Sequence, residues 1–473
     1  MTVYRHEEEL LEGFEGILHV ENGNVVIEDE TGLQGPAIDD VVYNAVFAHD
    51  EAKSAARWLL WEIGQEVGIR PASINDLYMA RGQSETVNGW TVPAMNLRGM
   101  AYDMARAVFQ AALPRDVGAM IFEIARSEMG YTGQPPAEYA SVVLAAAIRE
   151  GYRGPVFIQG DHFQVNPGKY TEDIDTELRA LEDLIRQSVQ AGFYNIDIDT
   201  STLVDLSQDT IEEQQRTNFD LSAHFTEIIR DVEPEGISIS VGGEIGEVGG
   251  KNSTPRELRG YMDGYYSELP DGMTGLSKIS IQTGTSHGGV VLPDGSLAQV
   301  KIDFDVMRRL SDMARDEYGM GGAVQHGAST LPEEAFHKFP EEGCLEIHLA
   351  TGFQNIIYEH PAFPDDLRQR IYDYLKDEHA HRWKDDQTEE QFIYDNRKRA
   401  LGIFKQPIWD ITANARQDIR AALEEKFAFL FEQLNAGDTR DLVEEHIDAP
   451  VFHKDISEFA VKGAAAADAE LAD

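Results

Sequence analysis

An aspartate and a histidine stand side by side in the segment VFIQGDHFQVNP, residues 156–167. The apolar run at 155–160 predicts a buried β-strand that ends at Gly160, just before Asp161 and His162. A carboxylate can move protons, and an imidazole can move protons or bind a metal ion. Because neighbouring side chains point to opposite faces of a strand, both groups reach one place only if the chain leaves the strand after Gly160 and turns.

Two further histidines follow predicted strands: His287 in TSHGG and His326 in QHGAS. Three imidazoles with an open fourth position are a usual arrangement for catalytic Zn²⁺, and the same donors suit Co²⁺, Fe²⁺ or Ni²⁺. We therefore interpret His162, His287 and His326 as ligands of a catalytic divalent metal. His348, in the last predicted strand, is a fourth histidine near a strand end. A structural role is the alternative for any single one of them.

Glycine-rich segments follow several of the predicted strands. The segment SVGGEIGEVGGKNST, residues 240–254, carries Glu244, which could bind the metal or hold a ligand histidine in place. The segments SHGG (286–289) and HGAS (326–329) expose backbone N–H groups of the kind that cradle phosphate. A surface loop and ordinary turns are the alternatives, because glycine-rich loops alone are weak signals.

Eight short apolar runs alternate with helical patterns, which is typical of a (β/α)8 TIM barrel. A doubly wound open sheet is the competing fold. The active site of such a barrel lies at the carboxyl ends of its strands, where the histidines and Glu244 fall. The strands are predicted at 90–95, 118–124, 155–160, 194–199, 237–242, 278–283, 323–326 and 344–349.

The chain divides by pattern into three regions. Residues 1–85 predict an N-terminal extension with a hairpin around Asn22–Asn24 and a helix at 50–67. Residues 86–360 predict the barrel. Residues 361–473 predict a C-terminal helical region, with a long helix at 411–435 and a frayed tail.

Composition narrows the class of protein. The chain has 84 acidic and 40 basic residues and a formal charge of −44, which disfavours nucleic acid and anionic membranes as partners. Its single cysteine excludes an internal disulfide. With no signal-peptide pattern and no 18-residue apolar run, we expect a cytoplasmic protein. An acidic surface with few lysines suggests a cytosol of high salt, where screening reduces self-repulsion.

Across residues 83–360 these segments together resemble the class II, metal-dependent ketose-bisphosphate aldolases. The resemblance rests on six segments in the family's order, any one of which alone would be weak. They are TVPAMN (91–96), GDHF (160–163), YNIDIDTS (194–201), GGEIGEVGG (242–250), the TSHGG and QHGAS pair, and HLATGFQN (348–355).

The resemblance implies a divalent-metal site. Position by position, it makes His162, His287 and His326 the ligands of Zn²⁺ or another divalent transition metal. It gives Glu244 and Asp199 an alternative or adjacent metal position. A monovalent cation near these loops is also implied.

The resemblance further implies an acid/base and a substrate site. Asp161 would move the proton of the C4 hydroxyl, and basic groups in YDNRKRALG (394–402), Arg397 with Lys398, are candidates for the distal phosphate. Residues implied to contact the substrate or its phosphates are Asn96, Gly288, Gly327, Ser329 and Thr351.

The implied reaction is the cleavage and formation of fructose 1,6-bisphosphate in glycolysis and gluconeogenesis, by a homodimer or homotetramer. No predicted strand ends in a lysine, as a Schiff-base aldolase would require. Lys251-Asn252-Ser253 replaces the family's second acid/base pair, and His348 and Ala350 replace an Asn and an Asp common in strand eight. Three alternatives stay open: an aldolase for another phosphorylated ketose such as tagatose bisphosphate, a non-catalytic aldolase-like barrel subunit, and a sugar isomerase. MGYTGQPPAEY (129–139) resembles the companion subunit of tagatose-bisphosphate aldolase.

Overall fold

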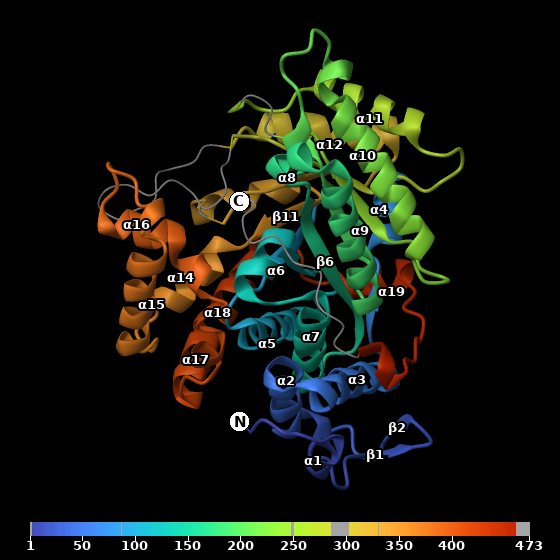
Figure 1. Ribbon diagram of the computed structural model, residues 1–473. Coiled ribbons are helices and arrows are strands. Elements are labelled where there is room, and N and C mark those ends of the chain that lie inside the picture. Colours follow the sequence, from blue (N-terminus) through green and yellow to red (C-terminus); the bar gives the residue numbers. More distant parts are fainter. Residues whose placement is uncertain (1, 87, 247–249, 285–301, 330, 460–473) are drawn as a thin grey trace.

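The computed structural model describes residues 2–86, 88–246, 250–284, 302–329 and 331–459. Eight parallel strands form a closed barrel in which sequential strands are neighbours, and β6 pairs with β7 while β4 pairs with β11. The (β/α)8 barrel predicted from the sequence is therefore confirmed (Figure 1). Its strands are β4 (Val92–Asn96), β5 (Ile121–Ala125), β6 (Gly154–Gln164), β7 (Asn195–Asp199), β8 (Ser240–Glu244), β9 (Lys278–Ile281), β10 (Ala323–Gln325) and β11 (Glu346–Leu349).

Amphipathic helices surround the barrel and bury their apolar sides against it. The helix α9, for example, places Leu181, Leu184 and Ile185 in the core, and it is capped by the preceding Asp173, whose carboxylate accepts from the Thr176 N–H. The principal helices from β4 to the end of the barrel are α5 (Ala101–Ala112), α6 (Arg126–Thr132), α7 (Pro136–Glu150), α8 (Pro167–Glu172), α9 (Ile174–Ala191), α10 (Ile211–Val232), α11 (Pro255–Glu268), α12 (Phe304–Tyr318), α13 (Lys338–Glu341) and α14 (Thr351–Glu359).

The strand β6 runs further than the sequence predicts. It continues through Asp161 and His162 to Gln164, instead of ending at Gly160. Between Gly160 and Phe163 its register against β7 shifts, and His162 adopts a left-handed backbone with φ of 39°. A β-bulge thus replaces the expected turn, because one extra residue re-aims the side chains while strand pairing resumes beyond it.

The N-terminal region contributes a strand to the barrel sheet. The strand β3 (Ile69–Ala72) pairs in parallel with the first half of β6, and β7 takes over along the second half. The Asn195 side chain of β7 joins the two, since it donates to the Ala72 and Ile158 carbonyls and accepts from the Ile74 N–H. The region's other elements are α1 (Glu7–Glu12), the hairpin β1 (Leu18–Glu21) and β2 (Asn24–Ile27), α2 (Ala37–Phe47), α3 (Asp50–Val67) and α4 (Asn75–Gly82).

The C-terminal region is helical, as the sequence predicts, and α18 packs against α5. Its elements are α15 (Asp365–Glu378), α16 (Glu389–Asn396), the 3₁₀ turn η7 (Arg397–Ala400), α17 (Lys405–Trp409), α18 (Ala413–Gln433) and α19 (Arg440–His446). Figure 1 shows α15 and α16 to one side of the barrel and α2 and α3 below α5 and α7. The three-region division of the chain stays a prediction.

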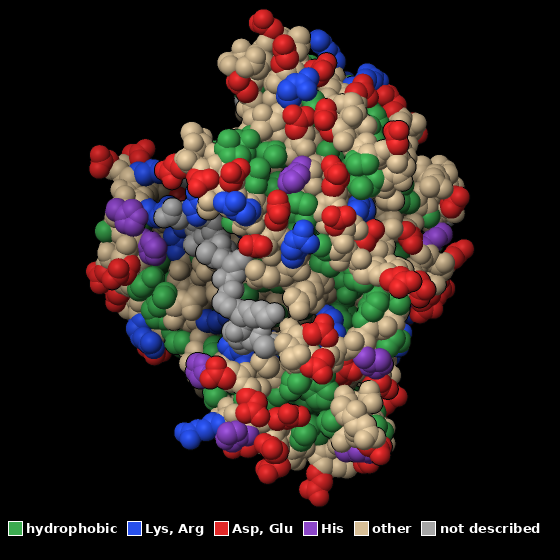
Figure 2. Space-filling view, turned by 45° about the vertical axis from the view of Figure 1, so that its right-hand side comes forward, with side chains coloured by type: hydrophobic (Ala, Val, Ile, Leu, Met, Phe, Trp, Pro, Cys, Tyr) green, Lys and Arg blue, Asp and Glu red, His purple; other side chains and the backbone are tan. Residues whose placement is uncertain are grey.

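The surface is acidic, in line with the composition. Figure 2 shows Asp and Glu side chains spread over the whole face in view. Among the described helices, none is both long and apolar enough to cross a membrane.

Candidate active site

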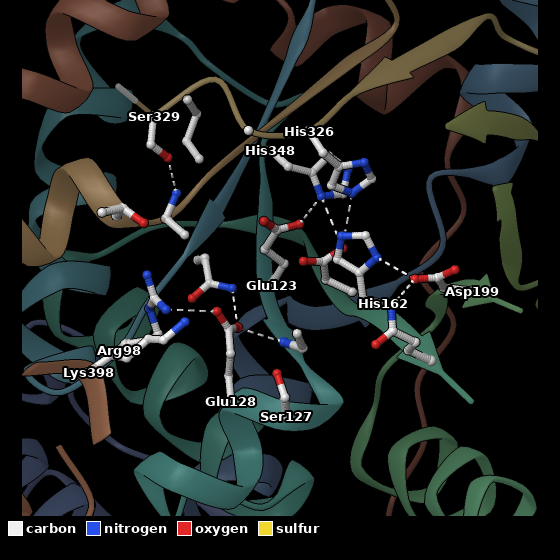
Figure 3. Close-up of a pocket in the computed structure, with 18 of the residues that line it drawn as sticks. Arg98, Glu123, Ser127, Glu128, His162, Asp199, His326, Ser329, His348 and Lys398 are labelled. Atoms are coloured by element: carbon white, nitrogen blue, oxygen red, sulfur yellow. Dashed lines mark hydrogen bonds and ion pairs between the residues drawn. The ribbon is translucent and has the colours of Figure 1, made fainter. Parts of the chain in front are cut away.

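A cavity of about 480 Å³ opens at the carboxyl ends of the barrel strands. Nine of the residues predicted for the site line it: Asn96, Asp161, His162, Asp199, Glu244, His326, Gly327, Ser329 and Thr351. His287 and Gly288, which were also predicted, lie outside the described residues. The barrel therefore gathers side chains from seven of its strand ends into one site (Figure 3).

The bulge in β6 explains how Asp161 and His162 share this cavity. Asp161 keeps its place opposite Ala125 of β5, whereas His162 is the extra residue before pairing with β7 resumes at Phe163. The Nε2 of His162 lies 4.0 Å from Oδ1 of Asp161. Asp161 and His162 therefore both face the cavity, although they are neighbours within one continuous strand.

Three of the predicted metal ligands come together: His162, Glu244 and His326. Each offers a ligand atom within 4.8 Å of the others, and the two imidazole rings lie 4.3 Å apart between centroids. The Nδ1 of His326 is held by the Ser280 hydroxyl at 2.7 Å, which leaves Nε2 facing the site. Two imidazoles and a carboxylate are a donor set that suits divalent transition metals.

Asp199 orients His162. Its carboxylate lies 3.0 Å from Nδ1 of His162 and accepts hydrogen bonds from the Gln164 amide and the Ser201 hydroxyl. Burial alone would raise the pKa of Asp199, but the hydrogen bond and charge of His162, together with the hydrogen bonds from Ser201 and Gln164, outweigh it, and the pKa falls to about 2. A carboxylate behind a ligand imidazole is the arrangement that fixes the ring's tautomer and direction in metal sites.

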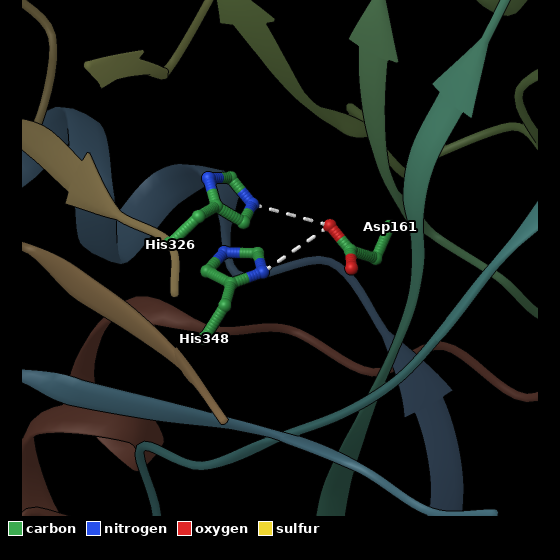
Figure 4. Close-up of side chains that lie close together, drawn as sticks. All are labelled: Asp161, His326 and His348. Atoms are coloured by element: carbon green, nitrogen blue, oxygen red, sulfur yellow. Dashed lines mark hydrogen bonds and ion pairs between the residues drawn. The ribbon is translucent and has the colours of Figure 1, made fainter. Parts of the chain in front are cut away.

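His348 belongs to the same cluster, although it is not among the ligands predicted from the sequence. Asp161, His326 and His348 form a second group with metal-binding geometry, and Figure 4 shows both imidazoles turned toward the Asp161 carboxylate. The distances to Asp161 Oδ1 are 3.3 Å from His326 and 3.2 Å from His348. The position of His348 near the carboxyl end of the eighth strand was the signal in the sequence that pointed to this role.

The charges in the cluster favour metal binding by His326. Burial and the neighbouring His348 and His162 lower the pKa of His326, so its imidazole is neutral, the form that binds metals. Burial would raise the pKa of Asp161, but His162 and His348 hold that pKa well below its usual range. Burial and then Asp199 raise the pKa of Glu244 to about 8. A bound cation would offset the cost of keeping this carboxylate ionised.

The ammonium group of Lys278 lies in the barrel interior, beside the histidine–carboxylate cluster. The Lys278 ammonium donates to Gln159 at 2.7 Å and to Glu346 at 2.5 Å, and it lies 2.9 Å from Asp197. Asp197, Glu346 and His348 form a third group with metal-binding geometry, but Lys278 already neutralises it. Burial would lower the pKa of Lys278, but Asp197 and Glu346 together raise it, so the ammonium stays protonated.

The loops after β10 and β11 form another wall of the cavity. The Ser329 hydroxyl accepts a hydrogen bond from the Ala350 N–H at 2.6 Å, which joins the two loops. Thr351 opens α14, so the N-terminal end of this helix faces the cavity. Helix N-termini attract anions, which makes this wall suitable for phosphate.

The third wall carries basic groups from two distant segments, Arg98 after β4 and Lys398 in η7. The predicted Arg397 is placed differently. Its guanidinium donates to Asn355 at 2.5 Å and to Glu359 at 2.9 Å, and it is not among the residues that line the cavity. Asn96 also lines this wall, and its amide donates to Glu128.

The fold and the cavity define a class of (β/α)8 proteins with a histidine–carboxylate site at the carboxyl ends of the strands. The profile of the family "Fructose-bisphosphate aldolase class-II" matches residues 83–427. The chain belongs to this aldolase family, whose members are lyases that act on phosphorylated sugars and generally depend on a divalent metal.

A curated relative is the D-tagatose-1,6-bisphosphate aldolase subunit GatZ of Escherichia coli O157:H7 (strain EC4115 / EHEC). It is 28% identical over 130 residues, covering 26% of this chain and 30% of GatZ. The chain thus spans less than half the length of the curated relatives it matches.

Two solved structures share the fold. The fructuronate-tagaturonate epimerase UxaE of Cohnella laeviribosi superposes with a TM-score of 0.58 and 14% identity, over 90% of this chain and 98% of that chain. A probable tagatose 6 phosphate kinase of Sinorhizobium meliloti 1021 superposes with a TM-score of 0.52 and 17% identity, over 80% of this chain and 97% of that chain.

Proposed function

We propose that this chain is a divalent-metal-dependent aldolase that cleaves and forms fructose 1,6-bisphosphate. The products of cleavage would be dihydroxyacetone phosphate and glyceraldehyde 3-phosphate. The observation that carries the proposal is the convergence of His162, Glu244 and His326 beside Asp161 in one cavity. A scaffold without chemistry has no need to gather these groups at strand ends.

The residues present fit a divalent metal. His162, Glu244 and His326 would hold Zn²⁺ or another divalent transition metal, with Asp199 fixing the ring of His162. A metal ion bound there supplies Lewis-acid stabilisation of the negative charge that develops on the ketone half of the substrate. His287 is proposed as a further ligand on the resemblance alone, and a monovalent cation near the phosphate loops is proposed on the same basis.

Asp161 is proposed to take the proton of the substrate's C4 hydroxyl during cleavage. Its carboxylate is ionised, lines the cavity and is held between His326 and His348 at 3.3 and 3.2 Å. A group held this firmly can accept a proton in one direction and return it in the other. Ser329, Thr351 and Gly327 would receive a phosphate at the N-terminal end of α14, and Asn96 would contact the sugar.

We assign none of the described residues as the second acid/base of the reaction. Asn252, which stands where the family has an acidic residue, donates to Asp303 at 3.3 Å at an exposed position. Glu247, an acidic residue of the same loop that we propose as a substitute, lies outside the described residues. Asp161 is therefore proposed for one of the two proton transfers, that of the C4 hydroxyl.

Tagatose 1,6-bisphosphate is the second candidate substrate. The match to GatZ favours it, because that protein is named as a tagatose-bisphosphate aldolase subunit. The same name also supports the alternative of a subunit that assists a partner aldolase. A homodimer or homotetramer and a cytoplasmic location remain parts of the proposal that rest on the resemblance and the composition.

The direct test is cleavage of a panel of ketose mono- and bisphosphates by the purified chain, before and after chelation, with metal analysis. We expect a bound divalent metal and cleavage of at least one ketose bisphosphate that chelation abolishes. Cleavage that survives complete metal removal, or a metal-free chain that cleaves no ketose, would overturn the proposal.

A further inference from the structure

The helix α4 of the N-terminal region packs against the amino ends of three barrel strands, β4, β5 and β11. Its buried Arg81 donates to the Trp90 carbonyl at 2.8 Å and to the Cys344 carbonyl at 3.3 Å, just before β4 and β11. The apolar contacts belong to one buried cluster, which includes Leu77, Tyr78, Val92, Ile121 and Leu345. The N-terminal region thus lies at the end of the barrel opposite the candidate active site.

Tyr78 reaches from α4 into the barrel interior. Its hydroxyl donates to Oε2 of Glu346 in β11, 268 positions later in the chain, and both side chains are fully buried. The other oxygen, Oε1, accepts from Lys278 at 2.5 Å and from Gln159 at 2.9 Å. It also lies 2.7 Å from Nε2 of His348. Tyr78 therefore holds the carboxylate oxygen that points away from these three groups.

His348 continues this chain of contacts from Glu346 to Asp161. Its Nδ1 lies 2.7 Å from Glu123 and 3.2 Å from Oδ1 of Asp161, toward which the ring is turned (Figure 4). Burial would lower the pKa of His348, but Glu123 and Asp161 raise it well above its usual range. A ring with carboxylates at both nitrogens has a fixed direction, and it fixes the carboxylate of Asp161 in turn.

A charged carboxylate in the barrel interior is more than a buried tyrosine needs as a partner. Other buried tyrosines of this chain use neutral acceptors: Tyr139 donates to the Glu123 carbonyl at 2.5 Å, and Tyr265 donates to the Thr226 hydroxyl at 3.1 Å. Burying charges costs desolvation free energy, and apolar side chains of similar volume are often as stable. The charge of Glu346 is therefore best explained by what it holds, the ring of His348.

We propose that Tyr78 is a positioning residue of the active site, which acts through Glu346 and His348 to fix the carboxylate of Asp161. This inference rests on the proposed function, in which Asp161 moves the proton of the substrate. Tyr78 is not among the residues that line the cavity, so it touches no reacting atom. The N-terminal region is thereby part of the catalytic unit.

The first experiment measures steady-state cleavage of a ketose bisphosphate by the metal-loaded full chain and by Tyr78→Phe. We expect kcat to fall by about 10-fold, the size of one hydrogen bond to a charged group, while KM and metal content stay nearly unchanged. Tyr265→Phe is the matched control, because it removes a buried hydroxyl bond between α10 and α11, away from this chain of contacts. It should leave kcat unchanged.

The second experiment repeats the Tyr78→Phe comparison in the Asp161→Asn background. If Tyr78 acts through Asp161, its replacement should now change kcat by about 2-fold or less, because the group that it positions is gone. Equal losses in the two backgrounds would mean a general structural effect and would overturn the inference. Glu346→Gln breaks the same chain one contact nearer to His348. It should show the same dependence on Asp161, and it replaces Tyr78→Phe if that variant does not fold.

A third measurement needs no turnover. Nuclear magnetic resonance of the full chain with labelled histidine ring nitrogens follows His348, whose signal is identified by its loss in His348→Gln. We expect this signal to shift in Tyr78→Phe and not in Tyr265→Phe, and an unmoved signal in Tyr78→Phe would overturn the inference. If the unaltered chain cleaves no ketose, the aldolase proposal falls. The His348 signal then decides by itself whether Tyr78 controls the ring.

Discussion

The Nε2 of His326 lies 3.3 Å from Oδ1 of Asp161, a residue 165 positions earlier in the chain. This contact joins the proposed metal site to the proposed acid/base. It exists because β6 and β10 both end at the mouth of the barrel, on opposite sides of the ring, with three strands between them in either direction.

Replacing Asp161 should separate proton transfer from metal binding. We expect Asp161→Asn to keep the bound metal and to lower kcat for ketose bisphosphate cleavage by about 10²-fold or more, the usual range for a general base. The amide keeps the size of the side chain but cannot accept the hydroxyl proton. Metal content and steady-state kinetics are measured on the same preparation. Turnover close to that of the unaltered chain would remove Asp161 from the mechanism.

Replacing Asp199 should weaken the metal site without removing a group that the chemistry needs. Since its carboxylate lies 3.0 Å from Nδ1 of His162, we expect Asp199→Asn to lower the affinity for Zn²⁺ by about 10–100-fold. Competition with a chromophoric chelator measures this affinity. Asp209→Asn, at an exposed position nearby, is the matched control and should change nothing. Unaltered affinity in Asp199→Asn would contradict the orienting role.

The bulge in β6 can be tested at Gly160. A β-carbon there would overlap the ring of Phe163, which is fully buried and cannot move aside. We expect Gly160→Ala to lower the free energy of unfolding by about 1–3 kcal/mol and to weaken metal binding, because His162 would be displaced. Urea unfolding measures the first effect.

Gly13→Ala is the control for this substitution. Its added carbon would meet neighbours at 3.6 and 3.8 Å, which are ordinary contact distances. The free energy of unfolding should therefore change little or rise slightly. Equal effects of the two substitutions would argue against a packed bulge at Gly160.

The acidic surface should make stability depend on salt. With 84 acidic and 40 basic residues, exposed carboxylates repel one another at low ionic strength, and screening shortens that repulsion to about 3 Å at 1 M salt. We therefore expect Tm to rise between 0.1 and 2 M KCl. A Tm that stays constant or falls over this range would exclude adaptation to a cytosol of high salt.

Most of the barrel could be predicted because each strand is a short apolar run bounded by turn residues. The predicted run at 194–199 corresponds to β7 at Asn195–Asp199, for example. The end of β6 could not be predicted in this way. The bulge depends on a left-handed His162 and on pairing with β7, neither of which shows in the local pattern.

The sequence by itself determined which residue types stand at the strand ends, since the barrel pattern and the positions of Asp161, His162, Glu244 and His326 follow from it. Tertiary structure alone decided how these groups face one another. His348 joined the cluster because its neighbours Glu123 and Asp161 come from other strands. Lys398 rather than its neighbour Arg397 lines the cavity because η7 packs on α6 in one orientation. Contacts between segments far apart in the sequence place both His348 and Lys398, and the local sequence pattern around each residue does not predict those contacts.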